Sequence, residues 1–204
     1  MTILTLFTLI VFIYSVVIHE VSHGLAAQAL GDDTAKNMGR LSLNPLKHLD
    51  PFGSFIMPLV LLVISSGTFT FGYAKPVPYN PHNLRDQKYG PIKVALAGPA
   101  SNILIALVFG LMLRFLSGSL LGPAMSDLFA SIVFINLILA VFNLVPIPPL
   151  DGHWVLITLL PARLDAVRVF LYRYGIFLFV FFILFIYPLI FPIIPWLERL
   201  IVGS

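Results

Sequence analysis

Long apolar runs separated by short polar loops make up most of the chain. We place these runs at residues 4–29, 55–71, 93–115, 127–145 and 174–195. A helix needs about 20 mostly apolar residues to cross the roughly 30 Å of hydrocarbon in a bilayer, and all but the second run approach or exceed that length. The run at 55–71 is shorter and contains Pro58, so we predict a re-entrant hairpin there.

Composition agrees with this pattern. Hydrophobic residues make up 59% of the chain and charged residues only 10%, against roughly a quarter charged in soluble domains. We find no internal repeat and no polar stretch long enough for a separate soluble domain. The sequence therefore predicts an all-α polytopic membrane protein with about four transmembrane helices, built as one domain over residues 1–204.

The positions of lysine and arginine predict the orientation of the spans, because these residues collect on the cytoplasmic side of a membrane. The segment 116–126 has neither and is predicted to lie outside. The predicted cytoplasmic loops hold Lys36, Arg40, Lys47, Lys75, Arg85, Lys88, Lys93, Arg163, Arg168 and Arg173. Four crossings with both termini outside follow, and the first run is expected to be retained because it lacks the basic start of a signal peptide.

Two histidines four residues apart give the strongest chemical signal. In His19-Glu20-Val21-Ser22-His23 both imidazoles lie on one helical face, where they can reach one zinc ion, with Glu20 beside the open position of the metal. The chain contains no cysteine, so a metal would be bound by nitrogen and oxygen alone. The alternative is structural: two histidines bonded to neighbouring helices, with Glu20 protonated. Ionisable groups in an apolar span are costly, which favours the metal.

A catalytic zinc ion of this kind needs a third protein ligand. Asp151 is the best candidate, because it follows a proline-rich stretch that ends the preceding run and is followed by Gly152, where the backbone can bend. The alternative for Asp151 is an N-cap on the segment from His153 to Leu160. Asn102, which follows Gly98 and Pro99, is assigned to helix packing.

These motifs together resemble those of the site-2 protease family of intramembrane zinc metalloproteases. The resemblance rests on His19 to His23 and on Asn-x-x-Pro-x-Pro-x-Leu-Asp-Gly at 143–152, and similar stretches occur at 72–78 and 97–102. It implies the compact prokaryotic type, because the sequence leaves no room for a PDZ domain between Arg114 and Asp127 and shows no CBS domain at its carboxyl end.

The resemblance also implies roles for single residues. His19, His23 and Asp151 would bind one zinc ion, and Glu20 would be the general base that activates water. Asn143 stands where the family places an asparagine beside the active site, so its amide would hold the substrate backbone or the developing oxyanion. From the residue alone, a structural amide at a helix end is an equal alternative for Asn143.

The resulting prediction is a zinc metalloendopeptidase that cleaves peptide bonds within or next to transmembrane segments. Its expected partners are transmembrane protein substrates and the lipid bilayer, in a multi-pass protein of a prokaryotic plasma membrane. Its site is expected towards the cytoplasmic side, and a homo-oligomer is compatible with the sequence. The small net charge of +3, without interleaved aromatic residues, argues against nucleic acid. The alternatives are a membrane metal-handling protein and a catalytically inactive scaffold that binds helices.

Overall fold

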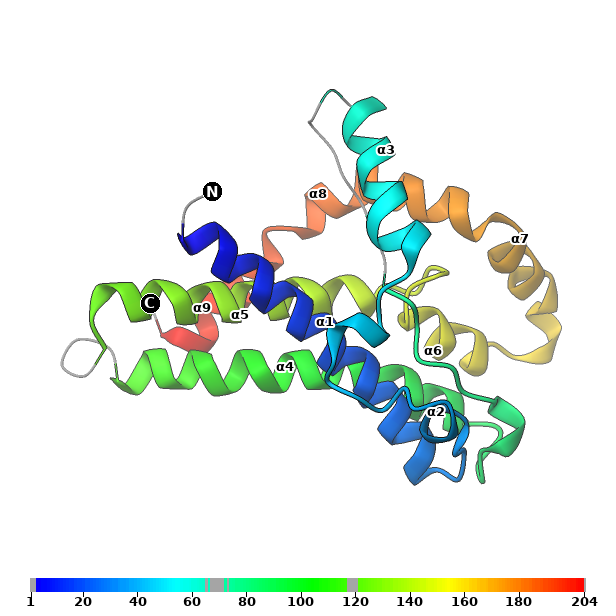
Figure 1. Ribbon diagram of the computed structural model, residues 1–204. Helices are drawn as coiled ribbons and strands as arrows, with labels where there is room; N and C mark the ends of the chain where they lie inside the picture. Colours follow the sequence, from blue (N-terminus) through cyan, green and yellow to red (C-terminus); the bar gives the residue numbers. More distant parts are fainter. Residues whose placement is uncertain (1–2, 65, 67–71, 73, 117–120, 204) are drawn as a thin grey trace.

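The computed structural model describes residues 3–64, 66, 72, 74–116 and 121–203, and within them it consists of helices, turns and loops (Figure 1). The long helices are α1 (Ile3–Ala29), α4 (Gly90–Leu116), α5 (Pro123–Asn143) and α7 (Asp165–Phe181). The shorter ones are α2 (Thr34–Asn37), α3 (Met57–Ile64), α6 (Gly152–Leu159), α8 (Tyr187–Ile190) and α9 (Ile193–Val202). Single turns of 3-10 helix lie at Pro45–Lys47, Pro81–Asn83 and Ala162–Leu164, and π-helical turns at Pro51–Ile56 and Phe182–Ile186.

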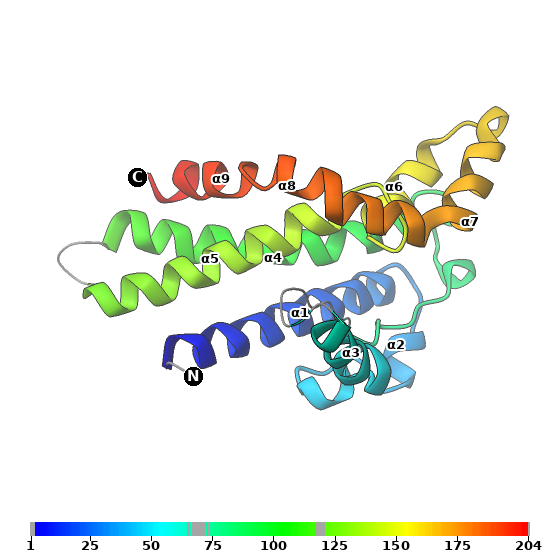
Figure 2. The same ribbon diagram turned by 90° about the horizontal axis from the view of Figure 1, so that it is seen from above.

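Four helices of the described residues are long and apolar enough to cross a membrane, as the sequence predicts. They cover Leu4–Ala29, Gly90–Leu116, Pro123–Asn143 and Ala162–Ile190. The chain is therefore an all-helical, multi-pass membrane protein. Both termini lie at one end of the bundle with the adjoining ends of α4 and α5, whereas α2 and α6 lie at the other end (Figures 1 and 2).

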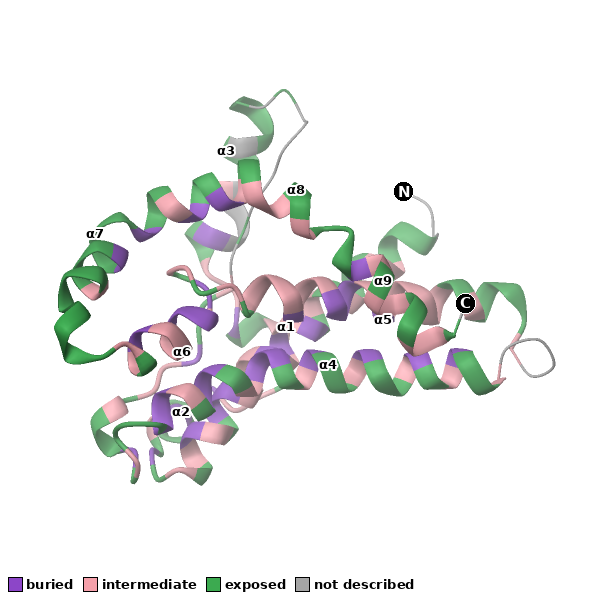
Figure 3. Cartoon of the chain, turned by 180° about the vertical axis from the view of Figure 1, so that it is seen from behind, coloured by how far each residue is buried: buried purple, intermediate pink, exposed green. Residues whose placement is uncertain are grey.

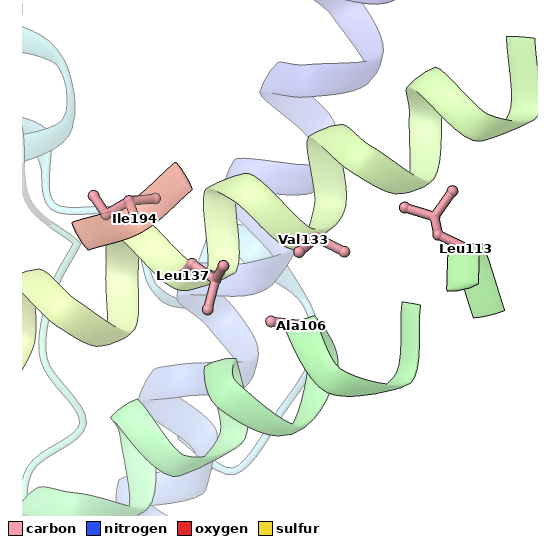
Figure 4. Packing of buried hydrophobic residues seen from close by; sticks show 5 residues of the cluster. All are labelled: Ala106, Leu113, Val133, Leu137 and Ile194. Atoms are coloured by element: carbon pink, nitrogen blue, oxygen red, sulfur yellow. The ribbon is translucent and has the colours of Figure 1, made fainter. Parts of the chain in front are cut away.

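The helices form three layers, which are clearest from above (Figure 2). The pair α4 and α5 forms the middle layer, α1 packs on one side of it, and the segment from α7 to α9 runs along the other. Ala106, Leu113, Val133, Leu137 and Ile194 form a buried cluster where α4, α5 and α9 meet (Figure 4). Gly110 lies against Ile201, so α9 approaches the α4 backbone closely.

Large apolar side chains cover the outside of the bundle. The exposed fraction is 62% for Leu104, 75% for Phe115 and 73% for Phe177, and exposed stretches recur along α4 and α7 (Figure 3). So much exposed apolar surface is unfavourable in water but stable against lipid, as expected for spanning helices.

The fourth span begins earlier in the structure than the sequence predicts. The fourth span was predicted to begin at residue 174, but α7 begins at Asp165. Of the arginines interpreted as loop residues, Arg168 and Arg173 lie on the helix itself and Arg163 lies in the 3-10 turn before it. Arg168 donates to the carbonyls of Ile157 and Leu160 at the end of α6. The predicted hairpin at 55–71 contains α3, and residues 65 and 67–71 lie outside the described residues.

Candidate metal centre

Three predicted ligands converge at the point where α1 faces α4 and α6. Nε2 of His19 lies 3.0 Å from Nε2 of His23 and 3.0 Å from Oδ2 of Asp151. Nε2 of His23 lies 3.2 Å from the same carboxylate oxygen. Among the described residues, these three form the group of histidine and carboxylate side chains arranged to hold a metal.

The opposite nitrogens of the two rings determine how the protons are placed. Nδ1 of His19 lies 2.6 Å from Oδ1 of Asn102, and Nδ1 of His23 lies 2.7 Å from the carbonyl oxygen of Val94. Both partners are hydrogen-bond acceptors, so each Nδ1 carries the proton and donates it. Each Nε2 then presents a lone pair to the centre of the triangle. This is the usual way in which a second partner orients a metal-binding histidine.

Two imidazole lone pairs and a carboxylate oxygen at this spacing repel one another unless a cation lies between them. With zinc bonds of about 2.0–2.1 Å to nitrogen and oxygen, tetrahedral neighbours lie about 3.3 Å apart. The observed triangle of 3.0–3.2 Å is close to that size. The residues present therefore fit zinc with three protein ligands and one remaining position.

Asp151 reaches this point from the position directly before α6. Its backbone occupies the N-cap position of that helix, but its side chain makes no capping hydrogen bond. The N-cap alternative therefore does not account for the carboxylate. A Cβ atom at Gly152 would collide with the carbonyl oxygens of Leu144 and Val145, so only glycine allows the chain to turn here.

Gly98 on α4 provides the room for the two imidazoles. A Cβ atom at this position would lie 2.6 Å from Nε2 of His19 and closer still to Nε2 of His23. From the sequence, Gly98 was recognised only as part of the stretch 97–102, and this contact was not predicted. Close helix packing by small residues was the available signal.

A buried polar network connects the centre to α5. Asn102 and Asn136 are fully buried, and Nδ2 of Asn102 donates to Oδ1 of Asn136 at 2.9 Å. Nδ2 of Asn136 in turn donates to Oγ of Ser15 on α1 at 3.0 Å. Asn102 was assigned to helix packing, and the structure adds its contact with His19. Sequence reasoning missed Asn136, although an amide within an apolar span is itself a signal.

Glu20 lies on α1 between the two histidines and is half buried. Its Oε2 accepts a hydrogen bond of 2.8 Å from the backbone N–H of Val77. Tyr79, two residues after Val77, is not a second candidate for the general base. Burial and the nearby charge of Asp151 raise the pKa of the Tyr79 phenol to about 12, so it stays protonated at neutral pH.

Asn143 ends α5, and its role stays a prediction. Its Nδ2 donates to the carbonyl oxygen of Leu139 at 2.9 Å. Among the described residues no hydrogen bond joins Asn143 to His19, His23 or Asp151, so the arrangement found here matches the structural alternative.

Comparison with known proteins identifies the family. The model for peptidase family M50 matches residues 118–186. YwhC of Bacillus subtilis (strain 168), whose name places it provisionally among the zinc metalloproteases, is 39% identical over 189 residues, which is 90% of this chain and 81% of YwhC. The chain belongs to peptidase family M50. It is accordingly a zinc metalloprotease, in agreement with the resemblance to site-2 proteases seen in the sequence.

Other M50 relatives match over smaller shares. Rip2 of Mycolicibacterium smegmatis, named in the same provisional way, is 30% identical over 145 residues, which is 70% of this chain. The chain spans about half the length of Rip2, since the match covers 52% of it. A similarly named protein of Methanocaldococcus jannaschii is 52% identical over 65 residues, about a third of each chain. No solved structure gives a significant match.

Proposed function

We propose that this M50 peptidase hydrolyses peptide bonds within or next to the transmembrane segments of other membrane proteins. The observation that carries the proposal is the convergence of His19, His23 and Asp151 on one point beside a spanning helix. His19 lies ten residues before the end of α1, or about 15 Å along a helix that rises 1.5 Å per residue. A site at that depth can meet a peptide bond of a substrate helix inside the bilayer.

Each side chain of the site has its own role in this hydrolysis. Zinc, when bound, polarises the scissile carbonyl and acidifies water. His19, His23 and Asp151 would hold it, while Asn102 and the carbonyl of Val94 keep each Nδ1 protonated and each Nε2 directed inwards. Glu20 takes the proton from the attacking water and delivers it to the leaving amine. Asn143 would bind the substrate backbone or the developing oxyanion.

We place the site towards the cytoplasm of a prokaryotic plasma membrane. The end of the bundle where α1 finishes and α4 begins is bordered by Arg40, Lys47, Arg85, Lys88 and Lys93, and basic residues favour the cytoplasmic face. Relatives from B. subtilis and M. smegmatis support a prokaryotic source. The partners we propose are transmembrane protein substrates and the surrounding lipid, without nucleic acid.

Cleavage of a transmembrane reporter helix, measured together with zinc content, tests this function. Purified wild-type protein in lipid should contain one zinc ion per chain and cleave the reporter. Glu20→Gln should keep its zinc while cleavage falls by about 100-fold or more, because general-base catalysis contributes roughly 10²–10⁴-fold. Zinc without cleavage of any helix tested would favour a metal-handling protein or an inactive scaffold, and a protein without zinc would overturn this assignment of the site.

A further inference from the structure

The extended segment 75–78 lies against α1 at the level of Glu20. Val77 is 5% exposed, and its side chain packs on Gly24, where an added Cβ atom would lie 2.8 Å from Cγ1 of Val77. This close approach brings the N–H of Val77 to Oε2 of Glu20. Pro76 and Pro78 have no N–H, so Val77 is the single amide donor from residue 76 to residue 78.

Arg40 also binds this segment. Its guanidinium Nη2 donates to the carbonyl oxygens of Lys75 at 2.8 Å and Pro76 at 3.4 Å. Arg40 is only 7% exposed, and none of the ion pairs found among the described residues includes it. Burying a cation without a counter-charge costs free energy. The hydrogen bonds from Arg40 to two backbone carbonyls therefore indicate that residues 75 and 76 have to be held in a fixed position.

His48 completes the attachment. The N–H of Lys75 donates to the carbonyl oxygen of His48 at 2.8 Å, and the buried imidazole of His48 donates from Nε2 to the carbonyl of Ser42 at 2.7 Å. The loop 40–48 therefore binds both the N–H and the carbonyl of Lys75 and the carbonyl of Pro76, directly before the amide that meets Glu20.

We propose that Arg40 is a positioning residue for Glu20. By fixing the carbonyls of Lys75 and Pro76, Arg40 fixes the N–H of Val77, which orients the carboxylate of Glu20 so that one oxygen is held and the other is presented to water. Without that bond the carboxylate rotates about its side-chain torsions and is less often aligned for proton transfer. This inference rests on the proposed function, in which Glu20 is the general base.

Arg40→Ala, compared with Lys47→Ala, tests the proposal through the kinetics of helix cleavage. Lys47 is an exposed cation of the same loop whose Nζ bonds to Gly39, so its loss removes equal charge without touching segment 75–78. Arg40→Ala should lower kcat by about 10- to 100-fold, the usual effect of residues that orient a reacting group, with zinc content and KM close to wild type. Lys47→Ala should match the wild type. A raised KM with unchanged kcat would overturn the proposal, because the segment would then serve substrate binding.

Amide hydrogen exchange gives a second measurement that needs no activity. In a peptide covering residues 74–79, the two prolines leave the amides of Lys75, Val77 and Tyr79 to report. Exchange at Val77 should become at least about tenfold faster in Arg40→Ala and in Glu20→Ala, but not in Lys47→Ala. Unchanged exchange in Arg40→Ala would overturn the proposal even if the wild type cleaves no reporter, which separates this failure from failure of the proposed function.

Arg40→Lys keeps the charge and guards against misfolding of the alanine variant. Lysine lacks the planar fork of arginine and holds fewer carbonyls in a fixed direction. We therefore expect kcat and the protection of Val77 to lie between the values for wild type and Arg40→Ala. If Arg40→Lys and a folded Arg40→Ala both keep the wild-type kcat and the wild-type protection of the Val77 amide, a positioning role for Arg40 is excluded.

Discussion

Gly98 is the residue on which the space for the metal depends. A methyl group there would overlap the Nε2 atoms of His19 and His23, so we expect Gly98→Ala to push both rings apart. Zinc affinity should fall by about tenfold or more, the lower range for disturbed ligand orientation, and cleavage should fall with it.

A competition titration with a zinc chelator measures the effect of Gly98→Ala. Gly122→Ala is the matched control, because nothing lies within 4 Å of a Cβ atom at Gly122. Wild-type zinc affinity in Gly98→Ala would show that the rings have room to move and would contradict the packing described here.

Asp32 ties the end of α1 to the loop before α4. It is fully buried and accepts hydrogen bonds from Oγ1 of Thr34 at 2.5 Å, the N–H of Asn80 at 2.7 Å and Nδ2 of Asn83 at 2.8 Å. Burial raises the pKa of Asp32, but these hydrogen bonds outweigh burial and lower the pKa below its ordinary 3.8. The ionised carboxylate therefore stabilises the fold at neutral pH.

Because the folded-state pKa lies below the unfolded one, this stabilisation is present above about pH 3.8 and is lost as the pH falls through the folded-state value. Asp32→Asn should lower the free energy of unfolding at pH 7 by about 1–3 kcal/mol. The difference in free energy of unfolding between wild type and variant should become smaller below pH 3.8. Denaturation in mixed micelles across pH measures it. As a control, Asp33→Asn at the exposed neighbouring position should change the free energy of unfolding by less than about 0.5 kcal/mol. A difference between wild type and Asp32→Asn that stays constant down to pH 2 would contradict the stabilising role of the ionised Asp32 carboxylate.

At the scale of elements, α5 carries two asparagines with different predicted duties. Asn136 is buried in the network that reaches His19 through Asn102, whereas Asn143 lies two turns later and bonds to its own helix. Asn136→Leu should weaken zinc binding and lower the free energy of unfolding by about 1–3 kcal/mol, because it leaves Ser15 and Asn102 without their buried partner.

For Asn143→Leu, on the same helix, we expect the opposite pattern of effects on zinc affinity, stability and kcat. If its amide holds the substrate or the oxyanion, removing it should lower kcat by about 10²-fold or more, with zinc affinity and stability near wild type. Parallel measurement of zinc affinity, unfolding and cleavage for both variants gives the contrast. Equal cleavage by Asn143→Leu and wild type would establish the structural alternative for Asn143.

At the scale of the whole molecule, the arrangement of spans can be tested by labelling, because the chain contains no cysteine. We expect Gln87→Cys, before α4, to react with an impermeant thiol reagent only from the cytoplasmic side, and Met125→Cys, in the first turn of α5, only from the outside. Both residues are exposed. Reaction of both from the same side of sealed cells would contradict the four-crossing arrangement.

The sequence predicted those features of the molecule that depend on local spacing. His19 and His23 share a face of any helix, because they are four residues apart. The four apolar runs of sufficient length can be recognised without knowing which helices pack together. Asp151 was proposed from the bend that Gly152 allows, and the structure places it beside both histidines. The contacts of Gly98, Asn136 and Arg40 were not predicted, because they depend on which helix faces meet. The start of α7 was misplaced because arginines on a helix and in a loop look alike in a sequence.

The two hydrogen bonds that orient His19 and His23 bear on whether the protease stays folded when zinc is scarce. They run to Asn102 and to the Val94 carbonyl, and the residues that pack α4, α5 and α9 together lie outside the metal-binding group. Classical zinc fingers, by contrast, unfold when their metal is removed. Chelation should therefore give a folded, inactive and refillable protein, so that its activity in a cell would follow the availability of zinc without new synthesis.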